Sequence, residues 1–142
     1  MTIEENYRQT VFDPLRKKEV ALTPEERVRQ WFISVLRDSM GVPAHMMMSE
    51  VGFRFGSKPY RADIIVYDRK AHPLAVVECK RPEVTLDETV LEQAVRYNMV
   101  LDVRYIIITN GHKTFICRGE IEDGRRHYKF ADKLPHWTEM IE

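Results

Sequence analysis

The sequence predicts an α/β fold in which a mixed β-sheet is flanked by helices. Two segments carry apolar residues at helical spacing, and five short segments rich in β-branched residues surround them. The second helix lies between two of these strands, an order that is typical of the crossover between parallel strands. The length of 142 residues fits one domain.

The composition is that of a globular protein and excludes several classes. Hydrophobic residues make up 44% and charged residues 31% of the chain, so a disordered or fibrous protein is excluded. The 22 basic residues are balanced by 22 acidic ones, which excludes a protein that binds nucleic acid through a strongly cationic surface overall. A local basic patch is not excluded. No apolar run is long enough to span a membrane, and residues 1–6 are too acidic for a signal peptide. Two cysteines without zinc spacing favour a reduced, cytoplasmic protein.

The first helix is expected to follow a lead-in of 22 residues, residues 1–22, which has no strong periodicity. Thr23 can cap a helix that begins at Pro24, and Glu26 can complete a capping box. The apolar residues at helical spacing in this segment are Val28, Trp31, Phe32, Val35 and Leu36. Gly41 then ends the helix.

Three strands are expected next, over residues 46–55, 62–67 and 74–80, with loops between them at residues 56–59 and 68–73. All three contain β-branched or aromatic residues in short runs, and the last two are apolar enough to be buried. We therefore expect them to form the centre of the sheet.

A second helix is expected to begin at a capping box formed by Thr85 and Glu88. Two further strands, residues 104–109 and 112–118, are joined by Asn110-Gly111, which predicts a two-residue hairpin turn. We assign residues 23–118 to the core and residues 119–142 to a C-terminal extension of the same domain, with a turn at Asp123-Gly124.

Acidic residues occupy unusual places on two of the apolar strands. Asp63 begins one strand, whereas Glu78 and Lys80 end the next one and share a face because strand side chains alternate. If the two strands are antiparallel neighbours, Asp63 stands beside Glu78 and Lys80. Paired carboxylates are hard oxygen ligands that suit Mg²⁺ or Mn²⁺, and a lysine beside the metal can position a water for attack on a phosphodiester. The simpler alternative is a solvated strand end with a weak ion pair.

The arrangement of Asp63, Glu78-Cys79-Lys80 and the surrounding elements resembles the PD-(D/E)xK nuclease superfamily. The more specific resemblance is to the N-terminal nuclease domain of type I restriction enzyme R subunits. It rests on six short stretches in the same order and spacing, at residues 12–18, 22–30, 61–64, 77–82, 93–97 and 109–111. It implies a restriction-endonuclease-like core with the order α-β-β-β-α-β plus a hairpin strand.

The resemblance also implies the roles of the residues. Asp63 and Glu78 would ligate Mg²⁺, and Lys80 would act as general base or position the water. The proline that usually precedes the first acid is replaced by Ala62. Many relatives carry a further metal-facing glutamate on the first helix, and we favour Glu25 because Glu26 has a capping role.

Two more groups of residues are candidates for contact with DNA. Gln93 and Tyr97 lie four apart on a helix, hence on one face, and resemble the Gln-x-x-x-Tyr motif of type I R subunits and RecB-like nucleases. Arg54, Lys58 and Arg61 flank the strand of Asp63 and are suited to phosphate contacts.

The function expected from the sequence is Mg²⁺-dependent (or Mn²⁺-dependent) hydrolysis of DNA by an endodeoxyribonuclease. The chain has no P-loop motif and no helicase motor, so we expect a stand-alone relative or a fragment. Its partners would be DNA and the helicase, methylase or specificity subunits of a restriction system, and no membrane. The alternative is a catalytically weak or inactive nucleic-acid-binding module on the same fold.

Overall fold

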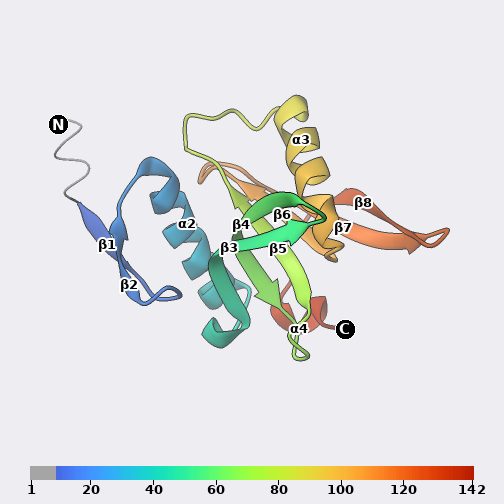
Figure 1. Ribbon diagram of the computed structural model, residues 1–142, viewed down its shortest axis with the longest axis horizontal. Coiled ribbons are helices and arrows are strands. Elements are labelled where there is room, and N and C mark those ends of the chain that lie inside the picture. Colours follow the sequence, from blue (N-terminus) through green and yellow to red (C-terminus); the bar gives the residue numbers. More distant parts are fainter. Residues whose placement is uncertain (1–8) are drawn as a thin grey trace.

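A six-stranded sheet forms the centre of the protein in the computed structural model, which describes residues 9–142 (Figure 1). Its strands are β3 (Met47–Phe55), β4 (Lys58–Tyr67), β5 (Pro73–Cys79), β6 (Tyr105–Thr109), β7 (Thr114–Glu122) and β8 (Arg125–Ala131). They lie side by side in this order. Only β5 and β6 are parallel, and α3 (Glu88–Asn98) connects them as the predicted crossover requires. The other neighbours are antiparallel.

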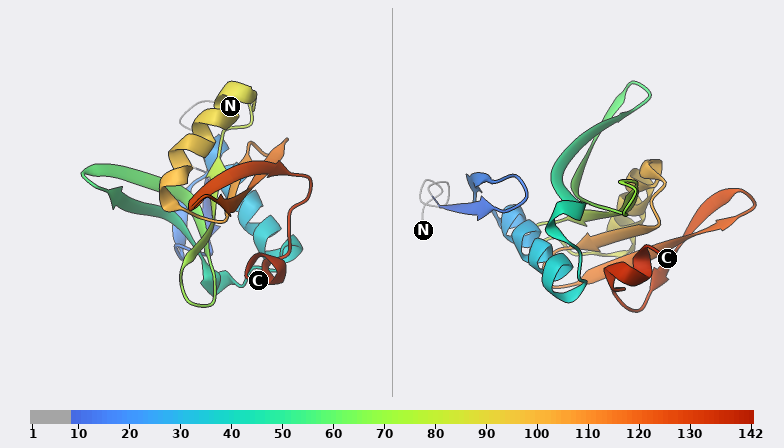
Figure 2. Two further views of the ribbon diagram at one scale, coloured as in Figure 1. Left: turned by 90° about the vertical axis from the view of Figure 1, so that its right-hand side faces the viewer. Right: turned by 90° about the horizontal axis from the view of Figure 1, so that it is seen from below.

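Helices cover both faces of the sheet and create two cores. Because side chains alternate along β5, Val77 packs with Phe32 of α2 (Pro24–Ser34), whereas Val76 packs with Ala94 of α3. The short C-terminal helix α4 (Trp137–Met140) joins the α2 side of the sheet. The result is three layers, helix, sheet and helix (Figure 2). The α/β fold predicted from the sequence is confirmed.

A small hairpin precedes the first helix. It is formed by β1 (Thr10–Asp13) and β2 (Lys18–Ala21), which form a separate two-stranded sheet. Asp13 is fully buried, and its carboxylate accepts hydrogen bonds from the Leu15 backbone and from Ser49 on β3. The predicted lead-in thus contains a hairpin, with strands of four residues that are too short to show periodicity. Residues 1–8, and with them the expectation about a signal peptide, lie outside the described residues.

One predicted turn and one predicted helix cap are wrong in detail. The β6–β7 loop has four residues, 110–113, because the Asn110 side chain accepts hydrogen bonds from the backbone of His112 and Lys113 and widens the turn. Helix α3 is capped by Asp87, whose carboxylate accepts from the Val90 backbone, and not by Thr85.

The first helix differs from its prediction at two side chains. Trp31 is 44% exposed, because the buried stripe of α2 passes through Val28 and Phe32 instead. Thr23 caps the helix as expected, but the Glu26 carboxylate binds arginines and does not complete a capping box. The chain leaves α2 through a π-helical turn at Val35–Ser39.

The remaining segments are short. Single 3-10 turns occupy Ala44–Met46 and Met99–Leu101. Strand β7 extends past residue 118, where the core was expected to end, and β8 pairs with it. The C-terminal extension therefore adds a strand to the same sheet. Across residues 9–142, no helix combines the length and the apolar character needed to cross a membrane.

Candidate active site

The antiparallel pairing of β4 and β5 brings the two predicted acids together. Ile64 pairs with Val77, so Asp63, one residue earlier, stands opposite Glu78, one residue later. Lys80 follows the end of β5, where its backbone N–H donates to the Thr109 carbonyl on β6. The chain thereby carries the acids and the lysine to the same end of two central strands.

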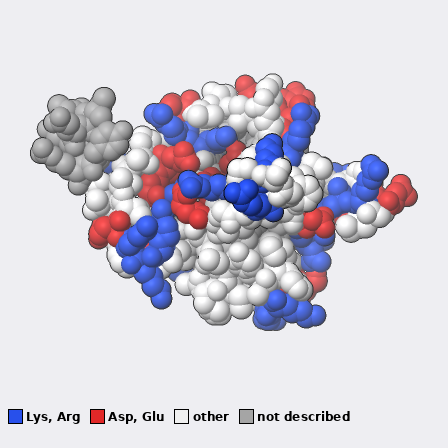
Figure 3. Space-filling model, viewed as in Figure 1, with Lys and Arg blue, Asp and Glu red and all other residues white. Residues whose placement is uncertain are grey.

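These residues line one cavity of about 550 Å³ between α2 and α3. Seven residues singled out from the sequence belong to it: Glu25, Arg61, Asp63, Glu78, Lys80, Gln93 and Tyr97. Arg54 and Lys58 lie farther out on the β3–β4 hairpin and do not line it. Figure 3 shows acidic and basic side chains gathered next to one another over this region.

Asp63 is held by two hydrogen bonds in a mostly buried position. Its Oδ2 accepts from the Cys79 backbone N–H at 2.6 Å, and its Oδ1 accepts from Nη2 of Arg29 at 3.1 Å. Burial raises the pKa of Asp63 above its ordinary value, and these two hydrogen bonds offset that rise only in part. The site therefore contains a carboxylate whose ionised form is costly to keep, which is common in functional sites.

Glu78 and Lys80 form an ion pair inside the cavity. Nζ of Lys80 lies 2.9 Å from Oε2 of Glu78, and Asn98 of α3 donates to Oε1 of Glu78 at 2.9 Å. Burial opposes the charge on Lys80, but the hydrogen bond to Glu78 and the nearby acids outweigh it and raise the pKa of the lysine. Lys80 is consequently protonated at neutral pH, which suits an electrostatic or water-orienting role better than that of a base.

Arg29 is the buried cation that the acids share. It is 4% exposed, and its guanidinium reaches Glu26 at 2.6 Å, Glu50 at 2.5 Å and Asp63 at 3.1 Å. Burial opposes its charge, yet the surrounding acids raise the pKa of Arg29 overall. Sequence reasoning missed this residue, and the one available signal was its spacing of three and four residues from two glutamates on a helix.

The two glutamates of α2 have different surroundings. Glu25 faces the cavity, and burial followed by the negative charge of Asp63 raises its pKa. Glu26 is directed away into an ion-pair network with Arg16 at 2.7 Å and Arg29 at 2.6 Å. The structure thus places Glu25, the glutamate favoured from the sequence, in the cavity with Asp63.

The two α3 residues of the Gln-x-x-x-Tyr pattern lie on the same wall of the cavity. Gln93 and Tyr97 both line it, and the Tyr97 hydroxyl accepts the Arg61 backbone N–H at 3.1 Å. The Arg61 guanidinium lies 3.2 Å from Glu50. Tyr97 therefore ties α3 to the strand that carries Asp63.

The chemistry of the donors fits a hard divalent cation. Asp63, Glu78 and Glu25 offer carboxylate oxygens, the ligands that Mg²⁺ and Mn²⁺ favour. Among the residues that the structure describes, however, no three acidic, histidine or cysteine side chains are grouped as ready metal ligands. The oxygens of Asp63 and Glu78 face Arg29, Lys80 and Asn98 instead, so a metal would have to compete with these groups.

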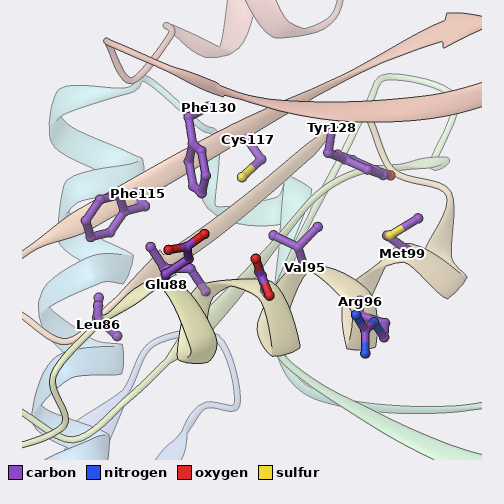
Figure 4. Close-up of a pocket in the computed structure, with 11 residues that line it drawn as sticks. Leu86, Glu88, Val95, Arg96, Met99, Phe115, Cys117, Tyr128 and Phe130 are labelled. Atoms are coloured by element: carbon purple, nitrogen blue, oxygen red, sulfur yellow. The ribbon is translucent and has the colours of Figure 1, made fainter.

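A larger cavity of about 650 Å³ lies on the other side of α3, against β7 and β8 (Figure 4). Figure 4 shows Phe115, Phe130 and Tyr128 of the strands on one side of the cavity and Val95 of α3 on the other, with Met99 of the following 3-10 turn at one end. Its walls are mainly apolar, and none of the predicted site residues belongs to it. The candidate active site therefore lies in the smaller, charged cavity.

A family model described as the type I restriction enzyme R protein N terminus matches residues 24–135. The chain belongs to this family. One similar solved structure is a fragment of a Vibrio vulnificus protein assigned as the HsdR subunit of a type I restriction enzyme. It is 21% identical with a TM-score of 0.54, a likeness that shows the shared fold. The match covers 82% of this chain and 24% of that one, so the chain spans about a quarter of that relative. A search of curated proteins finds no match.

Proposed function

We propose that the cavity of Asp63, Glu78 and Lys80 hydrolyses DNA phosphodiester bonds in the presence of Mg²⁺ or Mn²⁺, as the nuclease domain of a type I restriction enzyme R subunit. The observation that carries the proposal is the meeting of two acids from neighbouring strands, a lysine and a helix glutamate in one cavity of a chain from this family.

Each side chain has a distinct role in this proposal. Asp63, Glu78 and Glu25 would hold the metal, which when bound would neutralise phosphate charge and acidify a water. Lys80 orients the attacking water and stabilises negative charge on the phosphate, because its ammonium stays protonated. Gln93 contacts the DNA strand, and Tyr97 holds the backbone of Arg61 in place beside it.

The partners follow from the same proposal. The substrate is DNA, and the protein partners are the helicase, methylase or specificity subunits of a type I restriction system, because the chain belongs to the family of R-protein N termini. Such a system acts on DNA in the cytoplasm.

A second candidate function is a DNA-binding or interaction module that does not cut. It is favoured by the hydrogen bonds that Arg29 makes to Asp63 and that Lys80 and Asn98 make to Glu78, because they occupy the proposed metal ligands. Under this alternative the acids have no catalytic role.

Nicking of supercoiled plasmid separates the two functions. The protein should nick DNA with Mg²⁺ or Mn²⁺ and stop when EDTA is added, while Asp63→Asn and Glu78→Gln should abolish nicking. Glu92→Gln, an exposed acid of α3 that does not line the charged cavity, is the matched control and should cut normally. DNA binding without nicking, unchanged by Asp63→Asn, would support the second function.

A further inference from the structure

The β3–β4 hairpin carries a row of aromatic rings beside the candidate site. The hairpin projects from the body of the molecule (Figure 2). Phe53 and Tyr60 are cross-strand partners with ring centroids 5.4 Å apart and planes 13° apart. Tyr97 of α3 continues the row, with its centroid 5.0 Å from that of Tyr60. Sequence reasoning did not single out Phe53 or Tyr60, because Phe53 reads as an ordinary strand residue and Tyr60 falls between the predicted loop and the predicted strand.

This row borders a hollow of about 490 Å³. Its volume lies in the range of about 300–1,000 Å³ that is usual for small-ligand sites. Arg54 and Arg61 also border it, and no acidic residue among residues 9–142 does. Lys58 adds a third cation, with its Nζ 5.2 Å from the centroid of the Tyr60 ring. Aromatic surface flanked by cations is the composition of sites that stack bases and track a phosphate backbone.

The hollow adjoins the charged cavity. Arg61 and Tyr97 line both, so the two spaces meet at these residues. A polynucleotide with one phosphate at Asp63 and Lys80 would therefore place an adjacent nucleotide against the aromatic row.

We propose that this hollow binds one unpaired nucleobase of the DNA strand that enters the Asp63 cavity. The inference rests on the proposed function and deepens it, because it assigns single-stranded or locally unpaired DNA as the preferred substrate. In a duplex both faces of each base are covered by neighbouring base pairs, so an aromatic row has no base to stack against until the strands separate.

Fluorescence anisotropy with labelled oligonucleotides in EDTA tests the inference without hydrolysis. The protein should bind a single strand about tenfold more tightly than a duplex of the same length. Phe53→Leu and Tyr60→Leu should remove that preference, whereas Tyr60→Phe should keep it. Phe55→Leu is the matched control, since Phe55 is a 62% exposed aromatic of the same strand that does not border the hollow. Melting temperatures check that each variant is folded.

A second arm uses the unaltered protein with oligonucleotides that carry one abasic site, moved along the strand. One position should weaken binding about tenfold, and the others should not. Equal affinity for single strand and duplex, or indifference to every abasic position, would overturn the inference. Plasmid nicking is measured separately. Nicking without a preference for single-stranded DNA would contradict only this inference. A preference for single-stranded DNA without nicking would contradict only the hydrolytic function.

Discussion

Arg29 determines the electrostatics of the candidate site at the scale of single residues. One guanidinium neutralises acids from three elements, α2, β3 and β4, and it is almost wholly buried. Its Nε has no hydrogen-bond partner among the described residues, so the burial of this arginine is only partly compensated. The fold therefore tolerates a costly cation that holds Asp63 together with Glu26 and Glu50.

Replacement of Arg29 should strongly destabilise the fold, and a divalent metal ion should restore part of the lost stability. Arg29→Met should lower the free energy of unfolding by about 3–5 kcal/mol, because it leaves buried acids unpaired. Mg²⁺ or Mn²⁺ should then raise the melting temperature of the variant more than that of the wild type, since Asp63 no longer holds the arginine. Urea denaturation and thermal melts measure both effects. Arg37→Met, an exposed arginine, should change stability by less than about 0.5 kcal/mol. An equal metal response in Arg29→Met and wild type would place the ion elsewhere.

Asp63 gives stability a predictable dependence on pH. Its pKa is raised in the folded protein, so the stabilisation from the protonated carboxyl is present below the ordinary value of 3.8 and is lost as pH rises through the folded value. The amide introduced by Asp63→Asn cannot titrate. The free energy of unfolding of Asp63→Asn relative to wild type should therefore rise between about pH 4 and about pH 7. Denaturation in EDTA at both pH values measures the difference, and a fall over this range would contradict the account.

Substitutions of Glu25 and Glu26 on α2 should have different effects, the first on metal binding and the second on stability. Glu25→Gln should weaken the metal-induced rise in melting temperature with little effect on the metal-free protein, because Glu25 faces the cavity and is 44% exposed. Glu26→Gln should destabilise the fold by about 3 kcal/mol, because it weakens the pairs with Arg16 and Arg29. A weaker metal response in Glu26→Gln and a loss of stability in Glu25→Gln would contradict the roles that we assign.

The sequence predicts those site residues that depend on strand alternation. Asp63, Glu78 and Lys80 could be placed together because two adjacent apolar strands carry them at facing ends. Arg29 and Glu50 could not, since their contact joins residues far apart in the sequence and on different elements. No local pattern distinguishes such a pair from solvated charges.

At the scale of elements, β-branched composition predicts the central strands, and weak local signals account for the errors. The helix crossover follows from the order of β5, α3 and β6. The β1–β2 hairpin was missed because its stability comes from contacts such as the hydrogen bond between Asp13 and Ser49. The start of α3 was misplaced because Thr85 and Asp87 both carry capping side chains two residues apart.

The corrected cap gives a direct comparison. Asp87→Ala should cost about 1 kcal/mol in the free energy of unfolding, because the Val90 backbone N–H loses its acceptor. Thr85→Ala, a change at an exposed neighbour outside the helix, should cost less than about 0.5 kcal/mol. Urea denaturation of the two variants decides which residue caps α3, and a larger loss for Thr85→Ala would contradict the assignment.

At the scale of the whole molecule, the three layers place the candidate site where all of them meet. The sheet contributes Asp63 and Glu78, the helix on one face contributes Glu25, and the helix on the other contributes Gln93 and Tyr97. The same arrangement directs the β3–β4 hairpin away from the body of the molecule (Figure 2), and Arg61 of this hairpin lines the cavity. The fold thus joins a charged cavity to an aromatic surface, and Arg61 and Tyr97 line both.

In the proposed nuclease function, Lys80 acts on the reaction and not on DNA binding. Lys80→Ala should lower the single-turnover rate of DNA cleavage by about 100-fold or more, because the ammonium stabilises the transition state. Affinity for DNA, measured in EDTA, should change by less than about threefold, since the other cations beside the cavity remain. A cleavage rate that Lys80→Ala leaves unchanged, or a loss of rate fully explained by weaker DNA binding, would contradict the assignment of this cavity as a nuclease site.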